Sequence, residues 1–131
     1  GKRLLLRVDD IMHIENEIPK VLQDATLGDA LIEMSAKGLG VTAIVNKNNK
    51  FLGIFTDGDL RRVIDSGIDF KFSKIKDVMT KNAKRITGDA LAASALALME
   101  SYSINALVVV DKKEKLCGIL NMHDLLRARV I

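Results

Sequence analysis

The chain contains an internal repeat, and this repeat restricts its possible folds more than any other feature of the sequence. Residues 34–60 (MSAKGLGVTAIVNKNNKFLGIFTDGDL) align without a gap to residues 99–125 (MESYSINALVVVDKKEKLCGILNMHDL), at an offset of 65 residues. Eight aligned positions are identical, and most of the others exchange similar residues. Upstream, DIM at 10–12 matches DVM at 77–79 at an offset of 67. Such a repeat predicts two copies of one supersecondary unit.

Each copy of the repeat predicts the same order of secondary structure. Apolar residues at positions 27, 30, 31 and 34 stand at the spacing of one helical face, and positions 92, 95, 96 and 99 repeat this spacing. Two short apolar strands joined by a polar turn of hairpin length follow each helix. In the first copy Leu60, Val63 and Ile64 then share one face of a final helix, which Gly67 can end. The expected strands are residues 41–45, 51–55, 106–110 and 116–120.

These elements predict an α/β (α+β) fold built from two pseudo-symmetric β-α-β-β-α units. Apolar strands next to amphipathic helices indicate small sheets that helices cover. We expect the first unit, with an N-terminal linker, over residues 1–67 and the second over residues 68–131. Residues 68–77 join the two halves, and their spaced lysines predict a solvated linker.

Composition and charge exclude several classes of protein. The 131 residues are 48% hydrophobic and 28% charged, which is typical of a globular protein and not of a disordered chain. No apolar run approaches the roughly 20 residues that a membrane span needs. The net charge is only +3 and there is no tryptophan, so we expect no nucleic-acid surface.

Cysteine and histidine are too sparse for a disulfide framework or a metal site. Cys117 is the single cysteine; its apolar context indicates a buried structural thiol, and the composition fits a reducing cytoplasm. His13 and His123 have no second metal ligand nearby in the sequence, so we expect structural or surface roles and no metal or other cofactor. The chain starts at Gly1 instead of methionine, and we interpret it as a fragment of a longer protein.

The stretch GIFTDGDLRR at residues 53–62 joins an apolar strand to a cluster of polar and charged side chains. One interpretation is structural: Thr56 or Asp57 caps the following helix, and Asp59 is favoured in its first turn by the helix dipole. The other is a ligand site, in which Asp59 accepts the two hydroxyls of a ribose and Thr56 bonds the ribose or a phosphate. Arg61 or Arg62 then neutralises the phosphate. Both interpretations remain open at the level of the sequence.

The same turn occurs in both copies, as GIFTDGD at 53–59 and GILNMHD at 118–124. A strand ending in Gly-apolar-apolar-Thr-x-x-Asp at the start of a helix is the signature of CBS domains. The chain resembles a tandem CBS pair, or Bateman module, over nearly its whole length. Asn121 replaces the threonine in the second copy, which still leaves a side chain able to donate and accept hydrogen bonds.

The resemblance to CBS pairs implies a nucleotide site in each copy. The turn at the start of the last helix contacts the ribose and phosphate in that family, and the strand after the first helix flanks the base. The residues that match these positions are Thr56, Asp59, Arg61, Arg62, Val41, Thr42 and Ala43 in the first copy, and Asn121, Asp124, Leu107 and Val108 in the second.

A narrower resemblance involves four stretches spread over the chain. RLLLRVDDIM at 3–12, EIP at 17–19, GIFTDGDLRRV at 53–63 and MHDLLRA at 122–128 are similar to the C-terminal regulatory region of bacterial D-arabinose-5-phosphate isomerases. In that group a sugar-isomerase (SIS) domain precedes the CBS pair and interconverts ribulose 5-phosphate and arabinose 5-phosphate for synthesis of the lipopolysaccharide sugar Kdo.

This second resemblance implies a division of labour. The catalytic residues belong to the SIS domain, so we expect none in this chain, while the parent protein is an aldose–ketose isomerase. Cytoplasmic regulation by a small molecule is expected, with CMP-Kdo or an adenine nucleotide as candidate ligands and a homodimer formed through the CBS pairs. The alternative is a purely structural dimerisation module that binds no ligand.

Overall fold

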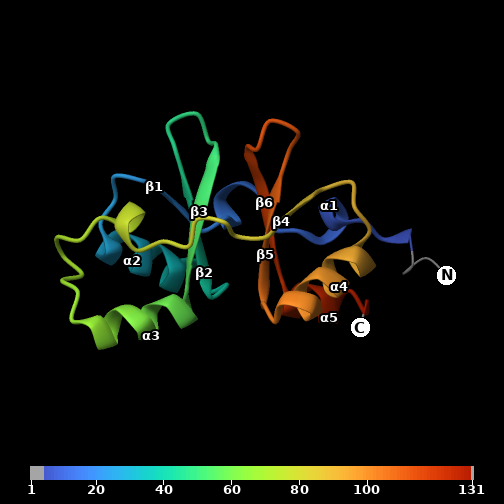
Figure 1. Cartoon of the computed structure of the whole chain (residues 1–131). Coiled ribbons are helices and arrows are strands. Elements are labelled where there is room, and N and C mark those ends of the chain that lie inside the picture. The colour runs from blue at the N-terminus through green and yellow to red at the C-terminus, as the bar shows by residue number, and fades with distance from the viewer. Residues whose placement is uncertain (1–4, 131) are drawn as a thin grey trace. The chain divides into compact units, whose positions relative to one another are not determined.

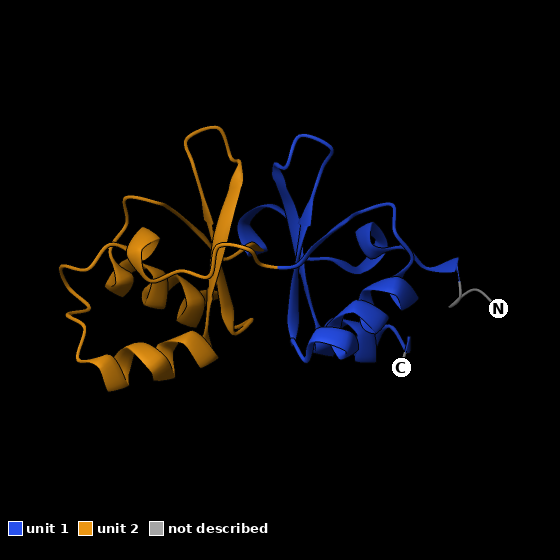
Figure 2. Cartoon of the chain, viewed as in Figure 1, with its two compact units in different colours: residues 1–17, 84–131 blue, residues 18–83 orange. Residues whose placement is uncertain are grey.

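The computed structural model describes residues 5–130, and the chain divides into two compact units. Unit 1 consists of Gly1–Glu17 and Lys84–Ile131, and unit 2 consists of Ile18–Ala83 (Figure 2). Unit 2 contains β1 (Lys20–Leu22), α2 (Leu27–Lys37), β2 (Val41–Val45), β3 (Phe51–Thr56), α3 (Asp57–Ser66) and η3 (Ile75–Asp77). Unit 1 contains α1 (Val8–Ile11), η2 (Glu15–Glu17), β4 (Arg85–Thr87), α4 (Ala92–Tyr102), β5 (Ala106–Val110), β6 (Leu116–Asn121) and α5 (Met122–Arg127).

Each unit is built on a mixed three-stranded sheet. The strand orders are β1-β2-β3 and β4-β5-β6. In both sheets the first pair is parallel and the second is an antiparallel hairpin, with a register irregularity before the last residue of the middle strand. In unit 2 the helices α2 and α3 lie to the same side of the hairpin (Figure 1). The expected α/β fold with two similar units and small sheets is therefore confirmed.

The predicted elements match the structure closely, because the spacing of apolar residues indicates which face of each helix or strand is buried. Strands β2 and β5 have the expected bounds, and β3 and β6 run one residue further, to Thr56 and Asn121. Helix α3 ends at Gly67, whose left-handed backbone (φ 75°) suits glycine. Leu27, Ala30 and Phe55 are fully buried in the core of unit 2.

The leading segment of each repeat packs on the other repeat. Val8 is fully buried in the core formed by α4, β5 and β6, whereas Ile75 is fully buried in the core formed by α2, β2 and β3. The compact units therefore differ from the consecutive ranges 1–67 and 68–131 expected from the sequence, of which residues 1–4 and 131 lie outside the described part. Both repeats offer a similar docking surface, so the repeat pattern does not reveal which one receives which segment.

Backbone bridges hold these exchanged segments. The N–H of His13 donates to the carbonyl of Ile119 at 2.8 Å, and the N–H of Ile119 donates back at 3.1 Å. In the other unit Thr80 and Ile54 exchange the corresponding pair at 2.8 and 3.0 Å. Each segment thus extends the edge of its hairpin by one antiparallel bridge.

Close approach at these bridges requires glycine. A Cβ added to Gly53 would lie 2.7 Å from the carbonyl oxygen of Thr80, and one added to Gly118 would lie 2.5 Å from the sulfur of Met12. These separations are well below van der Waals contact. The two glycines identical in the repeat therefore serve the docking of the leading segments.

The expectation that residues 68–77 form a solvated linker is wrong in part. The carbonyls of Phe70 and Ser73 accept the first backbone N–H groups of α2, from Gly28 at 2.9 Å and Leu27 at 2.8 Å, and Ile75 is buried. The lysines of this segment are exposed as expected. These lysines lie on the solvent-facing side of a docked segment. Their spacing is the same as in a free linker, so the sequence alone does not distinguish the two.

Candidate ligand site

The turn after β3 forms a complete capping box. Thr56 is the N-cap of α3; its hydroxyl accepts a hydrogen bond from the N–H of Asp59 at 3.3 Å, and the Asp59 carboxylate accepts one from the N–H of Thr56 at 2.9 Å. These two bonds satisfy donors that the first turn of a helix leaves without partners. The structural interpretation of Thr56 and Asp59 is thus realised in the geometry.

The Asp59 carboxylate is buried and has further donors around it. The residue is 5% exposed, and Oδ2 also accepts the Thr56 hydroxyl at 3.1 Å. The Thr80 hydroxyl lies 3.3 and 3.4 Å from the two carboxylate oxygens. Arg62 forms an ion pair with Oδ1 while its side chain stays 74% exposed. The site therefore combines a fixed carboxylate with a guanidinium that remains open to solvent, and Arg61 is exposed beside it.

The turn after β6 repeats this box with different residues. The Asn121 side-chain oxygen accepts from the N–H of Asp124 at 3.0 Å, and the Asp124 carboxylate accepts from the N–H of Asn121 at 2.7 Å. Asp124 is 4% exposed and forms an ion pair with Arg127, the counterpart of Arg62. Asn121 thus performs the capping role of the threonine that it replaces.

His13 joins the second turn, which sequence reasoning did not foresee. Its Nε2 lies 2.7 Å from Oδ1 of Asp124, and its Nδ1 lies 3.1 Å from Oε1 of Glu17. An imidazole always carries a proton on at least one ring nitrogen, so His13 can donate a hydrogen bond to one of these carboxylates. The offset of 67 residues that aligns DIM with DVM also aligns His13 with Thr80, so the repeat held the signal. His123, in contrast, is exposed.

A shallow hollow of about 340 Å³ opens beside this cluster in unit 1. It places His13, Glu17, Asp124 and Arg127 around one space. The hollow thus brings together two carboxylates, a guanidinium and an imidazole, of which the sequence analysis had selected only Asp124.

The strand residues predicted to flank a base are buried. Thr42 is fully buried, and its hydroxyl donates to the carbonyl of Ala30 at 2.9 Å. This bond ties β2 to α2 and uses the polar group of the side chain. The remaining members of this set are at most 2% exposed: Val41, Ala43, Leu107 and Val108.

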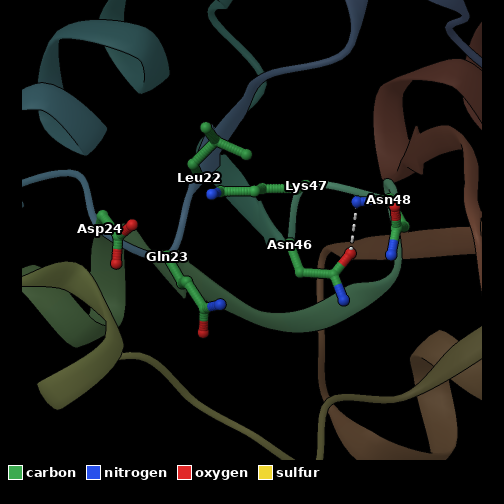
Figure 3. Close-up of a pocket in the computed structure, with 6 residues that line it drawn as sticks. All are labelled: Leu22, Gln23, Asp24, Asn46, Lys47 and Asn48. Carbon is green, nitrogen blue, oxygen red and sulfur yellow. Dashed lines mark hydrogen bonds between the residues drawn. The ribbon is translucent and has the colours of Figure 1, made fainter.

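A second hollow, of about 200 Å³, lies between the end of β1 and the turn of the β2–β3 hairpin (Figure 3). Leu22, Gln23 and Asp24 line it from one side, and residues 46–48 line it from the other. The side-chain oxygen of Asn46 accepts from the N–H of Asn48 at 2.9 Å, so this amide orders the hairpin turn. None of the predicted ligand residues lines this hollow.

Within residues 5–130 no group of three or more His, Cys, Asp or Glu side chains is arranged to hold a metal ion. Partial burial and the nearby Asp111 carboxylate raise the pKa of the Cys117 thiol. A raised pKa keeps the sulfur protonated and lowers its nucleophilicity. The raised pKa agrees with the interpretation of Cys117 as a structural thiol, but the residue is only partly buried and not fully buried as expected.

A search of the described helices finds none that is both long and apolar enough to cross a membrane.

Comparison with protein families finds the CBS domain model over residues 8–66 and 75–131. Among curated proteins, the arabinose 5-phosphate isomerases KdsD of Yersinia pestis and Pseudomonas aeruginosa are 53% and 51% identical to the chain over all 131 residues. The chain spans about 40% of the length of these relatives. The resemblances drawn from the sequence motifs are therefore confirmed.

Solved structures with the same fold include one in complex with AMP. A putative acetoin utilization protein (AcuB) from Vibrio cholerae has a TM-score of 0.85 at 28% identity, covering 97% of this chain and 93% of its own. CBSX2 in complex with AMP has a TM-score of 0.81 at 23% identity, covering 95% and 96%. The likeness to CBSX2 shows a shared fold.

Proposed function

The chain belongs to the CBS domain family, and from this premise we propose that it is the regulatory, ligand-binding CBS pair of a D-arabinose-5-phosphate isomerase. The identity of about half of all residues with KdsD proteins supports this assignment. The parent protein then joins this pair to a catalytic SIS domain, acts as a cytoplasmic aldose–ketose isomerase in Kdo synthesis, and dimerises through its CBS pairs. Catalysis belongs to the SIS domain, and this chain contributes sensing.

The ligand class that we propose is a nucleotide or a nucleotide sugar. The observation that supports it is the turn at Thr56–Asp59, where a buried carboxylate stands beside an exposed guanidinium of Arg62. A carboxylate accepts the hydroxyls of a ribose, and a guanidinium pairs with a phosphate. The AMP complex of CBSX2 supports an adenine nucleotide. CMP-Kdo carries the same ribose and phosphate and is the candidate from the pathway itself.

A structural dimerisation module is the second candidate, and a specific observation favours it. The capping boxes at Thr56–Asp59 and Asn121–Asp124 are complete without any ligand. Several large apolar side chains on the helices are also exposed, including Ile32, Ile64 and Leu126. This candidate predicts a stable dimer whose thermal unfolding does not respond to nucleotides.

Thermal unfolding with AMP, ATP, CMP and CMP-Kdo, each added alone, distinguishes the two functions. A ligand at about 100 times its Kd adds roughly 2.7 kcal/mol to the free energy of unfolding and raises the Tm visibly. We expect one of these compounds to raise the Tm of the unmodified chain and to have no effect on Asp59→Ala.

Asp29→Ala is the matched control, because Thr26 and Asp29 form the same capping box at the start of α2, with both bonds at 3.1 Å. Each variant loses one capping bond, which costs about 0.5–2 kcal/mol. Asp59→Ala also loses the contacts of its carboxylate with Arg62 and with the Thr56 and Thr80 hydroxyls. Only Asp59→Ala is expected to lose the ligand response. A cooperative transition that none of the four compounds shifts would favour the dimerisation module instead.

A further inference from the structure

The two ligand turns have matching carboxylates but different neighbours. Asp59 and Asp124 occupy equivalent positions, each is buried, and each pairs with an arginine three residues later. The exchanged leading segment adds one more side chain to each carboxylate. In unit 2 this side chain is Thr80, and in unit 1 it is His13.

Thr80 holds its carboxylate weakly. Its hydroxyl lies 3.3 and 3.4 Å from the two oxygens of Asp59, at the long end of hydrogen-bond distances, and the residue is exposed. A hydroxyl rotates freely about its C–O bond and both donates and accepts. The Thr56 hydroxyl, which also donates to Asp59, has the same freedom. An incoming ribose diol can therefore replace these donors while the threonines turn toward the ligand.

His13 holds its carboxylate firmly. The Nε2–Oδ1 distance of 2.7 Å to Asp124 is that of a strong hydrogen bond, and Glu17 engages the opposite ring nitrogen. The backbone of His13 is bound on both sides by its bridge to Ile119. The ring thus cannot withdraw unless it gives up the Asp124 and Glu17 contacts together, and its backbone stays fixed.

The two carboxylates differ in which of their donors can turn away from them. A carboxylate offers about four acceptor directions, two on each oxygen. At Asp124, Oδ1 already accepts from His13 and Arg127, and Oδ2 accepts from the N–H of Asn121. Asp59 makes the matching contacts with Arg62 and the N–H of Thr56, but its other donors are the two threonine hydroxyls, which can rotate toward a ribose diol, whereas the His13 ring is held by Asp124 and Glu17.

We propose that His13 determines which of the two turns binds ligand: it occupies Asp124 and closes the turn of unit 1, which leaves the turn at Thr56–Asp59 as the working site. This inference rests on the proposed nucleotide-binding function. In this proposal His13 acts through its contact with Asp124 and does not touch the ligand. The exchanged segment that carries His13 then decides which turn binds nucleotide.

Exchanging the two side chains tests the proposal. Nucleotide binding is measured by isothermal titration calorimetry with AMP, ATP, CMP and CMP-Kdo on the unmodified chain, His13→Thr and Thr80→His. We expect one site in the unmodified chain, a second site in His13→Thr, and at least a tenfold loss of affinity in Thr80→His. A charge-assisted hydrogen bond that a ligand must displace corresponds to about ten- to hundredfold in affinity.

His123→Thr is the matched control, because His123 is an exposed histidine in the same turn, and we expect it to bind one ligand as the unmodified chain does. The second site of His13→Thr should disappear when Asp124→Ala is added, whereas the first should disappear with Asp59→Ala. Circular dichroism of each variant checks that the fold is kept.

Four results would overturn the inference. Two equal sites in the unmodified chain, or one unchanged site in His13→Thr, would leave nucleotide binding intact and remove the role of His13. Binding that is lost in Asp124→Ala but kept in Asp59→Ala would place the working site in unit 1 instead of unit 2. Absence of binding of all four compounds to every folded variant would refute the proposed function and this inference with it.

Discussion

Helices α2 and α4 stand at the same place in the two units, but only α2 has conventional ends. Each has 11 residues. Thr26 caps α2 with a side-chain hydrogen bond, and Gly38 ends it in the left-handed conformation. The residues 65 positions later are Leu91, which makes no capping bond, and Ser103, which adopts φ 53° without being glycine. Helix α4 of unit 1 therefore forms with neither a side-chain N-cap nor a C-terminal glycine.

Packing explains why α4 forms without good caps. Ala92, Ala95 and Met99 are all fully buried, and Leu96 and Leu98 pack against the same core. Burial of a large apolar side chain such as Met99 contributes about 1.5–3 kcal/mol, at least as much as a cap. Because α2 buries Leu27, Ala30 and Met34 in the same way, the comparison shows that burial is sufficient for the helix and that the caps of α2 add to it.

The largest expected effect concerns the exchanged segments. Ile75→Ala removes a fully buried side chain from the core of unit 2 and should lower the free energy of unfolding by about 2–5 kcal/mol. Val8→Ala, its counterpart in unit 1, should cost less because fewer carbons are lost. Urea unfolding measures both. Lys76→Ala is the control, and a similarly small effect of Ile75→Ala would mean that residues 68–77 are a linker after all.

The next effect concerns the glycines of the docking bridges. Gly53→Ala should destabilise the chain by about 1–3 kcal/mol, because the new methyl group meets the Thr80 carbonyl at 2.7 Å. Gly58→Ala, five residues later in helix α3, would place its Cβ 3.7 Å from the Thr56 hydroxyl, an ordinary contact, and should stabilise the chain by about 0.5–1 kcal/mol. Thermal unfolding of both variants checks this opposite sign. Equal shifts would show that Gly53 is not constrained by the bridge.

A smaller effect concerns the ends of α2 and α4. Gly38→Ser places a side chain at φ 70° and should cost about 1 kcal/mol, whereas Ser103→Gly should gain about 0.5–1 kcal/mol by relieving φ 53°. The double exchange should be nearly neutral because the sites are independent. Chemical unfolding of the three variants makes the comparison, and a loss in Ser103→Gly would show that Ser103 has another role.

The smallest effect depends on pH and concerns the carboxyl group of Glu33 in α2. Partial burial raises the pKa of Glu33, but hydrogen bonds from Lys37 at 2.9 Å and from the N–H of Lys20 at 3.0 Å lower it by more. A carboxyl with a lowered pKa stabilises the fold above its ordinary pKa, and this contribution is lost as the pH falls through the folded value. The corresponding residue in unit 1 is Leu98, which has no charge.

Glu33→Gln should therefore cost about 0.5 kcal/mol near neutral pH, and the difference from the unmodified chain should shrink as the pH falls through the lowered pKa of Glu33. Urea unfolding at a series of pH values measures it. A difference that grows as the pH falls would contradict the sign of the shift.

Sequence reasoning predicted the local elements well and the contacts between them less well. The bounds of β2 and β5 follow from runs of apolar residues, and the end of α3 follows from Gly67, since each depends on neighbouring residues alone. At the candidate site, the turns containing Asp59 and Asp124 were recognisable because the repeat marks them. The burial of Thr42 and its bond to Ala30 could not be predicted, because the sequence around a threonine in a strand is the same whether its side chain faces a ligand or a helix.

The amino-acid sequence by itself determined the duplication, the order of strands and helices in each unit, and the two capped turns. These features depend on the spacing of nearby residues and on pairs of side chains three positions apart. Such residues meet through local chain geometry alone. Only the tertiary structure decided that the segments around Val8 and Ile75 exchange repeats, and that His13 and Thr80 face Asp124 and Asp59. These partners are separated by up to 111 residues, and their pairing depends on which of two similar surfaces each segment buries.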